Sequence, residues 1–483
     1  MCDSLSAVLA QREHGDGGDC GCGGLGAWAL WRLAPGKKGS QVLERMRLRG
    51  AACLRKLADT RAEQVSFTRF FRNPRVEVDE ILSAAGGRTA AAAAGRHVLL
   101  IEDTSEINYE AKAGRKRALG RVGNGSDVGL FVHPALALDG EDGAVLGLAG
   151  AEIWRRRKKK RADYQSQPIE SKESYRWLST IVAARARIER AARITVIADR
   201  EADIYELLAR LPDERTDVLV RATHNRALGD GGRLLTMLGA QPEAGRVSFA
   251  LPARDGRAGR TVVLAVRYCS TALRQPQRGA AAGDPPEVPI NVVEVSEIDP
   301  PSKKDAVVWR LLTTHAVASL EDAMGIVEMY RRRWAVEQLF RTLKSQAIDI
   351  EASFLEDGAA LERLAAAALV AATMVMQMVH GRGEAGWRLP AARVFSPAHI
   401  TVLHALTPKL QGKTAKQKNP HPPESLAWAA WHIARLGGWM GYASERPPGP
   451  ITFSRGLTRF EAIAEGFALM QTLGGIGKDV CQH

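Results

Sequence analysis

Three acidic residues are placed where they could act together on a phosphate ester. Asp103 and Asp199 each follow a short apolar run, at 97–101 and 194–198, and Glu337 lies in a long helical pattern. In an open α/β sheet, ligands gather beside the ends of strands. Hard divalent ions such as Mg²⁺ take carboxylate oxygens, and two such ions can support an in-line displacement at phosphorus. The three acids therefore predict a phosphoryl-transfer site.

Cationic and aromatic residues accompany the third acid. Tyr330, Arg333, Glu337 and Lys344 fall within roughly 60° of one another if the segment is helical, at about 100° per residue. Arg and Lys position nucleic-acid phosphates, and aromatic rings stack on displaced bases. This face predicts nuclease-type chemistry on DNA or RNA. The structural alternative is an ion pair across one helical turn.

The strand-end acids also have a structural alternative. An Asp after a strand often caps a helix or forms a turn. Glu201 and Asp203, just beyond Asp199, fit the first turn of a helix better than ligand positions. Two strand-end acids together favour a site over two unrelated caps.

A mixed α/β fold is expected to position these residues. Short apolar runs alternate with a helical pattern at 174–192, which is typical of strands joined by a crossover helix. Between 226 and 308 short turn-rich strands follow one another, and helical periodicity then runs from 319 to 344. The predicted strands of the first part span 97–101, 131–138, 144–148, 194–198 and 218–221.

Composition and charge limit the classes of protein. The chain has 483 residues, 45% hydrophobic and 25% charged, which excludes disorder, collagen and coiled coil as its main state. A net charge of +13 favours a polyanionic partner. Arg45, Arg47 and Arg49 lie in a helical pattern that is either a solvated face or a DNA-facing one.

A membrane role is not expected. The apolar run 364–379 is shorter than the about 20 residues of a spanning helix and includes Gln377, so it predicts a buried core helix. The first residues lack the apolar region of a signal peptide. We therefore expect a soluble, cytoplasmic protein.

Taken together, these motifs resemble the IS-four family of bacterial DDE transposases, and within it the Tn-five-like members. The resemblance rests on the strand end at Asp103, the stretch 199–203 and the Y-x2-R-x3-E-x6-K signature at 330–344, and it extends from 70–74 to 434–438. It implies an RNase H-like catalytic core in which Asp103, Asp199 and Glu337 bind two Mg²⁺ ions, with Mn²⁺ able to substitute.

The resemblance also implies roles for six further residues. Trp309 would stack on a base that is flipped from the duplex during hairpin formation. The others would contact the DNA, mainly its phosphates: Tyr330, Arg333, Lys344, Arg221 and Arg341.

The implied domain organisation has a split catalytic core. A helical DNA-end-binding region would span 1–75, although its first ~40 residues depart from the family pattern. The RNase H-like core would span 76–225 and 309–380, interrupted by a β-rich insertion at 226–308. A helical dimerisation region would span 381–483, with its Trp-rich segment either at the dimer contact or in the core.

The implied reaction is cut-and-paste transposition of an insertion sequence by a homodimer in a synaptic complex with double-stranded DNA. Water nicks one strand at the element end, and the freed 3′-OH attacks the opposite strand to form a hairpin. A second water opens the hairpin, and the 3′-OH then attacks target DNA.

Two other functions remain open. Because the first residues are atypical, the chain could be an end-blind transposase that dimerises with an active partner and inhibits it. It could also be an RNase H-like nuclease unrelated to transposition, although such an enzyme would need neither Trp309 nor the full Tyr-Arg-Glu-Lys set.

Overall fold

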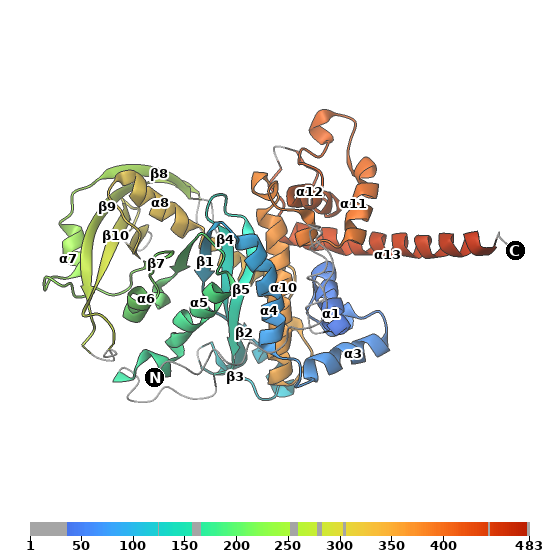
Figure 1. The fold of residues 1–483 in the computed structure, drawn as a ribbon, viewed down its shortest axis with the longest axis horizontal. Helices are drawn as coiled ribbons and strands as arrows, with labels where there is room; N and C mark the ends of the chain where they lie inside the picture. The colour runs from blue at the N-terminus through green and yellow to red at the C-terminus, as the bar shows by residue number, and fades with distance from the viewer. Residues whose placement is uncertain are drawn as a thin grey trace, which may run out of the picture.

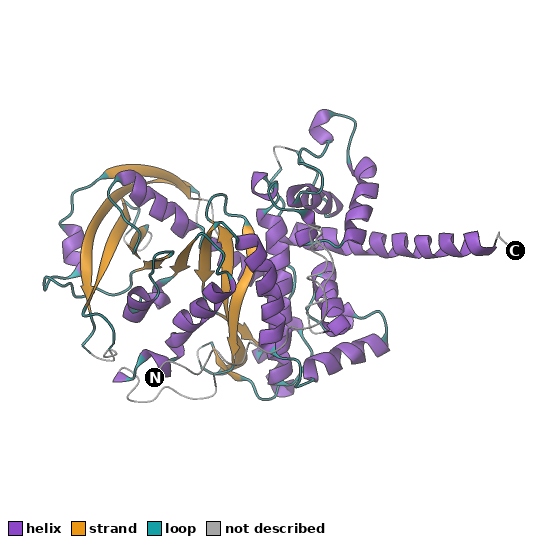
Figure 2. Ribbon diagram, in the orientation of Figure 1, coloured by secondary structure: helices purple, strands orange, loops and turns teal. Residues whose placement is uncertain are grey.

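One large mixed sheet organises the protein. The computed structural model describes residues 36–123, 125–156, 166–251, 259–277, 283–302, 306–442 and 445–480. Within them an 11-stranded sheet is covered by helices, so the expected mixed α/β class is confirmed (Figures 1 and 2). The strands are β1 (His97–Glu102), β2 (Ser105–Asn108), β3 (Gly120–Val122), β4 (Asp127–Asp139), β5 (Val145–Trp154), β6 (Arg193–Ala198), β7 (Thr216–Arg221), β8 (Gly245–Leu251), β9 (Arg260–Arg274), β10 (Glu287–Glu297) and β11 (Val308–Thr313).

The strand order places the two candidate aspartates side by side. The sheet runs β2-β4-β1-β6-β7-β11-β10-β9-β8, and β5 and β3 also pair with β4. Strands β1, β6 and β7 are parallel to one another, whereas β4 is antiparallel to β1. Beyond β7 every pairing is antiparallel. The segment predicted as a β-rich insertion therefore extends this sheet through β8, β9 and β10.

The first strand is interrupted at Asp103. Strands β1 and β2 pair with β4 in the same register, Glu102 opposite Ala135 and Ser105 opposite Val132. The residue of β4 that lies opposite Asp103 is therefore Pro134. Proline has no N–H to give to the ladder, so the pairing stops here and the Asp103 backbone leaves the sheet.

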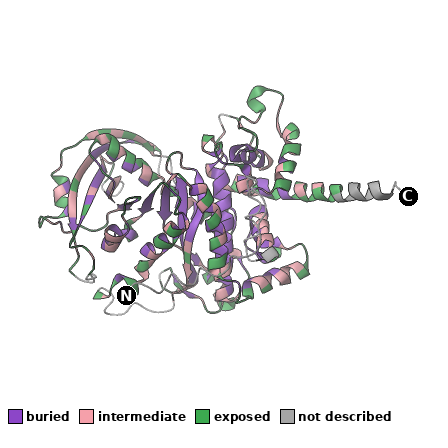
Figure 3. Cartoon of the chain, viewed as in Figure 1, coloured by how far each residue is buried: buried purple, intermediate pink, exposed green. Residues whose placement is uncertain are grey.

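Three helices pack on the β4–β5 side of the sheet: α4 (Val78–Ala93), α5 (Arg176–Arg187) and α10 (Gly358–His380). The close approach of β5 to α4 requires a glycine, because a Cβ on Gly147 would lie 2.3 Å from Thr89 Oγ1. Helix α10 is apolar on nearly every face and crosses the centre of the molecule (Figure 3). By length and composition alone, α10 could cross a membrane. However, 83% of its apolar 18-residue stretch is buried inside the protein. The predicted core helix is thus confirmed.

The remaining helices lie at the two ends of the chain and beside the antiparallel half of the sheet. Helix α13 projects well beyond the rest of the molecule (Figure 1). Helix α3 ends at Arg72, two residues before Pro74, because the residue that precedes a proline is disfavoured in the helical conformation. These helices are α1 (Gly36–Arg49), α2 (Leu54–Leu57), α3 (Arg61–Arg72), α6 (Tyr205–Arg210), α7 (Leu234–Gly239), α8 (Leu320–Arg331), α9 (Trp334–Arg341), α11 (Pro397–Leu410), α12 (Leu426–Leu436) and α13 (Pro450–Val480).

The basic residues of α1 are structural. Arg45 donates to Glu461 of α13 at 2.8 Å, and Arg49 pairs with Asp59 at 2.6 Å. Arg47 is fully buried, with its guanidinium 5.3 Å from the ring centroid of Phe395. The DNA-facing interpretation of these arginines is wrong, because Arg45 and Arg49 pair with carboxylates of the protein and Arg47 is buried.

The Trp-rich helix near the C-terminus is core. Trp428 and Trp431 of α12 are 3% and 6% exposed, and α12 packs against α11 and α13. These side chains are therefore not available to a dimer partner. The atypical first residues, 1–35, lie outside the described part of the chain.

Candidate active site

Asp103 and Asp199 lie at neighbouring strand ends. Strands β1 and β6 are paired in parallel with Ile101 opposite Ile197, so the residues that follow them meet at one edge of the sheet. The Asp103 Oδ1 accepts from the Thr104 backbone N–H at 2.8 Å. The Asp199 Oδ1 accepts from the Glu201 N–H at 2.9 Å and caps the short helix η6 (Arg200–Ala202). Asp199 thus caps a short helix, which was the alternative to a ligand role for this residue, and it also lies next to Asp103.

Glu337 is connected to Asp103 through one arginine. One Arg333 nitrogen, Nη1, donates to Asp103 Oδ2 at 2.8 Å, and the other, Nη2, donates to Glu337 Oε1 at 2.8 Å. The ion pair expected across one helical turn is therefore present, and it is combined with a contact to the strand end. All three side chains are largely buried, with exposed fractions of 14% for Arg333, 17% for Asp103 and 33% for Glu337.

The helix that carries the signature is not continuous. Helix α8 ends at Arg331, α9 begins at Trp334, and a π-helical turn, η7 (Thr342–Gln346), follows α9. The prediction of one regular helix through 344 is wrong, because i→i+5 bonding in η7 shifts the rotation of residues that follow it. Lys344 lies inside this π-helical turn, and its Nζ reaches Ser105 Oγ, two residues after Asp103.

The charges at this edge of the sheet repel one another. Burial raises the pKa of Asp103 to about 6, and the nearby charges of Asp199 and Glu337 act in the same direction. Arg333 opposes this rise but does not cancel it. Crowded, partly desolvated carboxylates of this kind are stabilised by a bound cation.

The donor set fits a hard divalent ion in part. Asp103 and Asp199 offer carboxylate oxygens at one edge, which is the chemistry that Mg²⁺ and Mn²⁺ prefer. Glu337 is held away from them by Arg333. Among the described residues, no group of three His, Cys, Asp or Glu side chains is close enough to hold one ion together. Glu337 would have to leave Arg333 to complete the set.

The predicted aromatic residues are in contact with each other and with two arginines. The Trp309 and Tyr330 rings meet edge to face with their centroids 5.5 Å apart. Tyr330 is 4% exposed and lies close to Arg333, whose guanidinium is 6.0 Å from its ring centroid, and to Arg221. Burial raises the pKa of Tyr330, and the two arginines oppose that rise. Arg221, at the end of β7, also donates to the Val308 carbonyl at 2.8 Å.

The last two predicted DNA contacts differ in their surroundings. Lys344 Nζ donates to Ser105 Oγ at 3.3 Å, which brings the ammonium group near Asp103. Arg341 is exposed and stacks over the Trp334 ring at 5.2 Å. The structure therefore brings Lys344 to the strand end that follows Asp103 and leaves Arg341 on the surface of α9.

A pocket of about 440 Å³ adjoins this cluster between β8, β9 and α8. Trp309, Tyr330 and Arg333 form part of its wall, and Phe249 and Trp334 add two aromatic rings. Sequence reasoning missed Phe249 and Trp334. Trp334 sits inside the signature and could have been noticed there, whereas nothing local connects Phe249 of β8 to this site.

Behind Asp103 lies a buried pair that sequence reasoning also missed. Glu102 Oε1 is 3.3 Å from His133 Nε2, and both residues are fully buried. Burial holds the pKa of Glu102 well above its usual range and that of His133 well below its own, which favours the neutral form of each side chain. His133 Nδ1 lies 2.9 Å from Thr104 Oγ1, which also accepts from Arg176 at 3.1 Å. These buried contacts hold the backbone at Glu102 and Thr104, on either side of Asp103.

Asp203 has a structural role, but it does not lie in the first turn of a helix as predicted. It is 4% exposed and follows η6 instead of opening a helix. Its carboxylate accepts from the backbone N–H groups of Thr223 and His224 at 2.7 and 2.9 Å and from Arg226 at 2.7 Å. It therefore fixes the loop that follows β7, near Arg221.

Two comparisons with known proteins gave matches. The chain is similar to the piggyBac transposase in the cryo-EM structure of its synaptic complex with hairpin DNA, at 10% identity and a TM-score of 0.39, over 92% of this chain and 72% of that one. Residues 178–374 match the family profile of the transposase DDE domain. That match includes Asp199 and Glu337 and begins after Asp103. Residues 178–374 are thus similar to a transposase DDE domain.

Proposed function

We propose that this chain is a DNA transposase that moves an insertion sequence by cut-and-paste transposition. The observation that carries the proposal is the link from Asp103 through Arg333 to Glu337, beside Asp199 on the neighbouring parallel strand. Two acids at neighbouring strand ends and a third from a distant segment are thus connected at one edge of the sheet, the third through Arg333. The match of residues 178–374 to the transposase DDE domain supports the same conclusion.

We assign strands β5, β4, β1, β6 and β7 to an RNase H-like core. They are contiguous in the sheet, and they carry Asp103 and Asp199 at adjacent ends. The flanking helices at either end of the chain would bind the element ends and pair the protomers. The IS-four assignment within the DDE transposases is part of this proposal and rests on the signature at 330–344.

Asp103, Asp199 and Glu337 would hold divalent Mg²⁺, with Mn²⁺ as a substitute. When bound, such ions activate the attacking oxygen and stabilise the leaving one. The chain's own contribution is to place carboxylates close together at a partly desolvated edge of the sheet. Burial raises the pKa of Asp103 there, so a bound cation would stabilise its ionised form. Release of Glu337 from Arg333 on ion binding would free that guanidinium for a DNA phosphate.

The neighbouring side chains would hold the DNA. Lys344, Arg333 and Arg221 provide positive charge around the carboxylates, and Arg341 provides it on the exposed side of α9. Trp309, edge-on to Tyr330 and lining the aromatic pocket, is suited to stack on an unpaired base. These groups would grip the hairpin strand while the 3′-OH attacks.

A homodimer is part of the proposal. The projecting part of α13 exposes Leu469 and Met470 by 60% and 69%, and such apolar side chains on a protruding helix favour contact with a second protomer. We expect the protein to act in the cytoplasm on chromosomal or plasmid DNA.

The proposal is tested with a duplex that carries the element's own end sequence and Mg²⁺. A transposase gives a nick at the end, then a hairpin, and both bands are resolved on a denaturing gel. Salt-sensitive binding and dimerisation without any cleavage would instead indicate the end-blind inhibitor. Cleavage at random positions with no hairpin would indicate a plain nuclease.

A further inference from the structure

Arg176 connects the two strand ends that carry the candidate aspartates. It is the first residue of α5, and its side chain is 10% exposed. Its Nε donates to Thr104 Oγ1 at 3.1 Å, and its Nη2 donates to Glu201 Oε2 at 3.1 Å. One planar guanidinium thus bonds to the residue after Asp103 and to the second residue after Asp199.

Both partners of this guanidinium also bond directly to the aspartates. The Thr104 backbone N–H donates to Asp103 Oδ1 at 2.8 Å. The Glu201 backbone N–H donates to Asp199 Oδ1 at 2.9 Å. Each partner is therefore held at two points, by its own aspartate and by Arg176, and the position of one carboxylate is linked to that of the other.

Arg176 has little freedom to move. Its Nη1 donates to the Glu173 carbonyl at 2.9 Å, and its guanidinium lies 5.2 and 5.6 Å from the ring centroids of Trp154 and Trp177. The Glu173 carboxylate accepts from Trp154 Nε1 at 3.0 Å and from Arg156 at 2.7 Å, which fixes the start of α5 to the end of β5. All the nitrogens of Arg176 are engaged, so this side chain forms a rigid connection.

A rigid connection between the two aspartates suits a site for Mg²⁺. This ion requires near-ideal octahedral geometry at about 2.1 Å, so a small displacement of one carboxylate lowers its affinity. Groups that support metal ligands typically change metal affinity roughly 10- to 100-fold when they are removed. The direct effect of the Arg176 charge has the opposite sign, because a positive charge near a cation repels it. Arg176 can therefore favour metal binding only through position.

We propose that Arg176 is a positioning residue that sets the spacing of Asp103 and Asp199 for a divalent metal ion. This inference rests on the proposed function, because it assumes that the two aspartates hold the ion. Arg176 acts through Thr104 and Glu201 and is not itself a metal ligand.

The first test measures Mn²⁺ binding by the full chain in calorimetric titrations at constant ionic strength. Arg176→Gln should weaken Mn²⁺ binding roughly 10-fold, whereas loss of the charge alone would tighten it. Arg176→Lys keeps the charge but presents one nitrogen in place of three, so it should restore at most part of the affinity. Unchanged or tighter binding by Arg176→Gln, or the full parental affinity in Arg176→Lys, would overturn the proposal.

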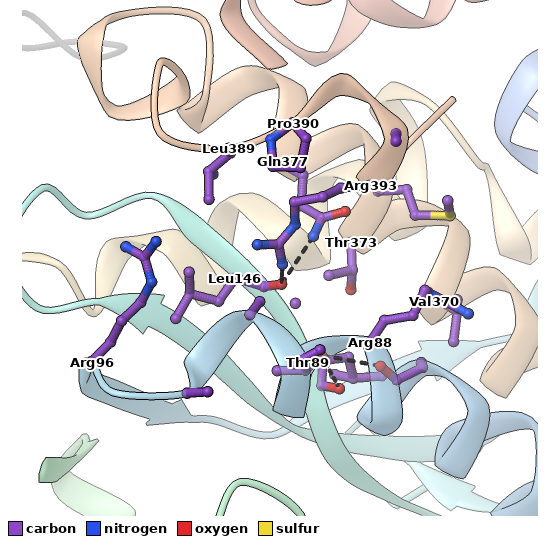
Figure 4. A pocket seen from close by; sticks show the side chains of 18 of the residues that line it. Arg88, Thr89, Arg96, Leu146, Val370, Thr373, Gln377, Leu389, Pro390 and Arg393 are labelled. Atoms are coloured by element: carbon purple, nitrogen blue, oxygen red, sulfur yellow. Dashed lines mark hydrogen bonds between the residues drawn. The ribbon is translucent and has the colours of Figure 1, made fainter. Parts of the chain in front are cut away.

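A second partly buried arginine provides the matched control. Arg393 lies after α10, lines a cavity of about 330 Å³ and donates to the Leu146 carbonyl (Figure 4). Arg96, on the wall of the same cavity, directly precedes β1, whose other end leads to Asp103. Arg393→Gln thus removes a guanidinium at the far end of that strand, and it should bind Mn²⁺ as the parent does.

Nicking of the end duplex separates this inference from the proposed function. In Arg176→Gln the Mg²⁺ concentration for half-maximal nicking should rise roughly 10-fold, while the rate at saturating Mg²⁺ stays within about 3-fold of the parent. A merely structural defect would lower the saturated rate as well. An unchanged Mg²⁺ requirement would overturn this inference and leave the proposed function intact. Absence of Mg²⁺-dependent nicking by the parent would overturn both.

A third test needs no metal. Amide hydrogen exchange, followed by mass spectrometry, reports on the Thr104 and Glu201 N–H groups in peptides that cover 101–108 and 199–205. Both peptides should exchange roughly 10-fold faster in Arg176→Gln, as the loss of their hydrogen-bonded support predicts, and at the parental rate in Arg393→Gln. If Arg176→Gln does not fold, Glu201→Ala, at a 66% exposed side chain, breaks the same link and should accelerate exchange at 199–205. Parental exchange rates in these variants would overturn the proposal.

Discussion

Arg333 donates hydrogen bonds to both Asp103 and Glu337, each at 2.8 Å. The arginine and Asp103 are 230 positions apart in the chain, so this contact joins the signature segment to the first strand. It lies within a cluster where burial, and then the charges of Asp199 and Glu337, raise the pKa of Asp103. Arg333 is therefore the counter-charge that the first and third acids share.

Replacing Arg333 should impair cleavage more than folding. Arg333→Gln removes a preorganised positive charge from the site, so nicking should fall roughly 100-fold at saturating DNA and Mg²⁺. Arg331→Gln alters an exposed neighbour and serves as the control. Single-turnover nicking assays measure both variants, and a normal rate for Arg333→Gln would exclude a role in the chemical step.

Trp309 should affect one step and spare another. Trp309→Ala removes a stacking surface worth about 1–3 kcal/mol per base, so hairpin formation should slow roughly 10-fold or more while nicking is retained. Trp309→Phe should restore most of the hairpin, and Trp387→Ala, at an exposed tryptophan, should change neither step. Equal loss of nicking and hairpin formation would mean that Trp309 is only structural.

Asp203 should be important for stability. Asp203→Ala leaves two backbone N–H groups and Arg226 without their acceptor inside the protein, which should cost about 3 kcal/mol. Asp230→Ala removes an exposed hydrogen bond and should cost well under about 1 kcal/mol. Urea unfolding of the two variants compares these losses, and similar midpoints would contradict the account.

Acid should destabilise the protein through buried histidines. Burial lowers the pKa of His432 to about 4, whereas an unfolded histidine titrates near 6.5. Because the unfolded chain takes up the proton first, the stability from neutral His432 is complete above about pH 6.5 and is lost as the pH falls toward 4.

For His432→Gln, the loss of unfolding free energy between pH 7 and pH 4.5 should be smaller than in the parent by roughly 2 kcal/mol. His224→Gln, at an exposed loop position, is the control. Urea titrations at the two pH values give the difference, and an unchanged pH dependence in His432→Gln would show that this histidine does not contribute to acid unfolding.

Local patterns in the sequence predict the parts of the fold that depend on local periodicity. The strands before Asp103 and Asp199, the end of α3 at Arg72 and the buried helix α10 were all predictable because each has its own apolar pattern or proline signal. The position of the two acids at strand ends followed from the expected mixed α/β sheet, whereas the direct pairing of their strands did not.

Contacts between distant segments were not predictable in this way. Three features depend on how the elements pack. These are the pairing of Arg45 with Glu461, the burial of Asp203 and the presence of Phe249 in the same pocket wall as Trp309. The break between α8 and α9 and the π-helical turn also escaped prediction, because the hydrophobic period continues through both. Tertiary packing decided these features against the local pattern.

The central claim is that Asp103, Asp199 and Glu337 form one metal-dependent site. The most direct test is Mg²⁺-dependent nicking of the end duplex by Glu337→Gln, compared with Glu321→Gln at an exposed acid of α8. We predict that Glu337→Gln loses nicking and still binds DNA within about 3-fold of the parent, because ligand loss spares the basic contacts. Normal nicking by Glu337→Gln would contradict the account.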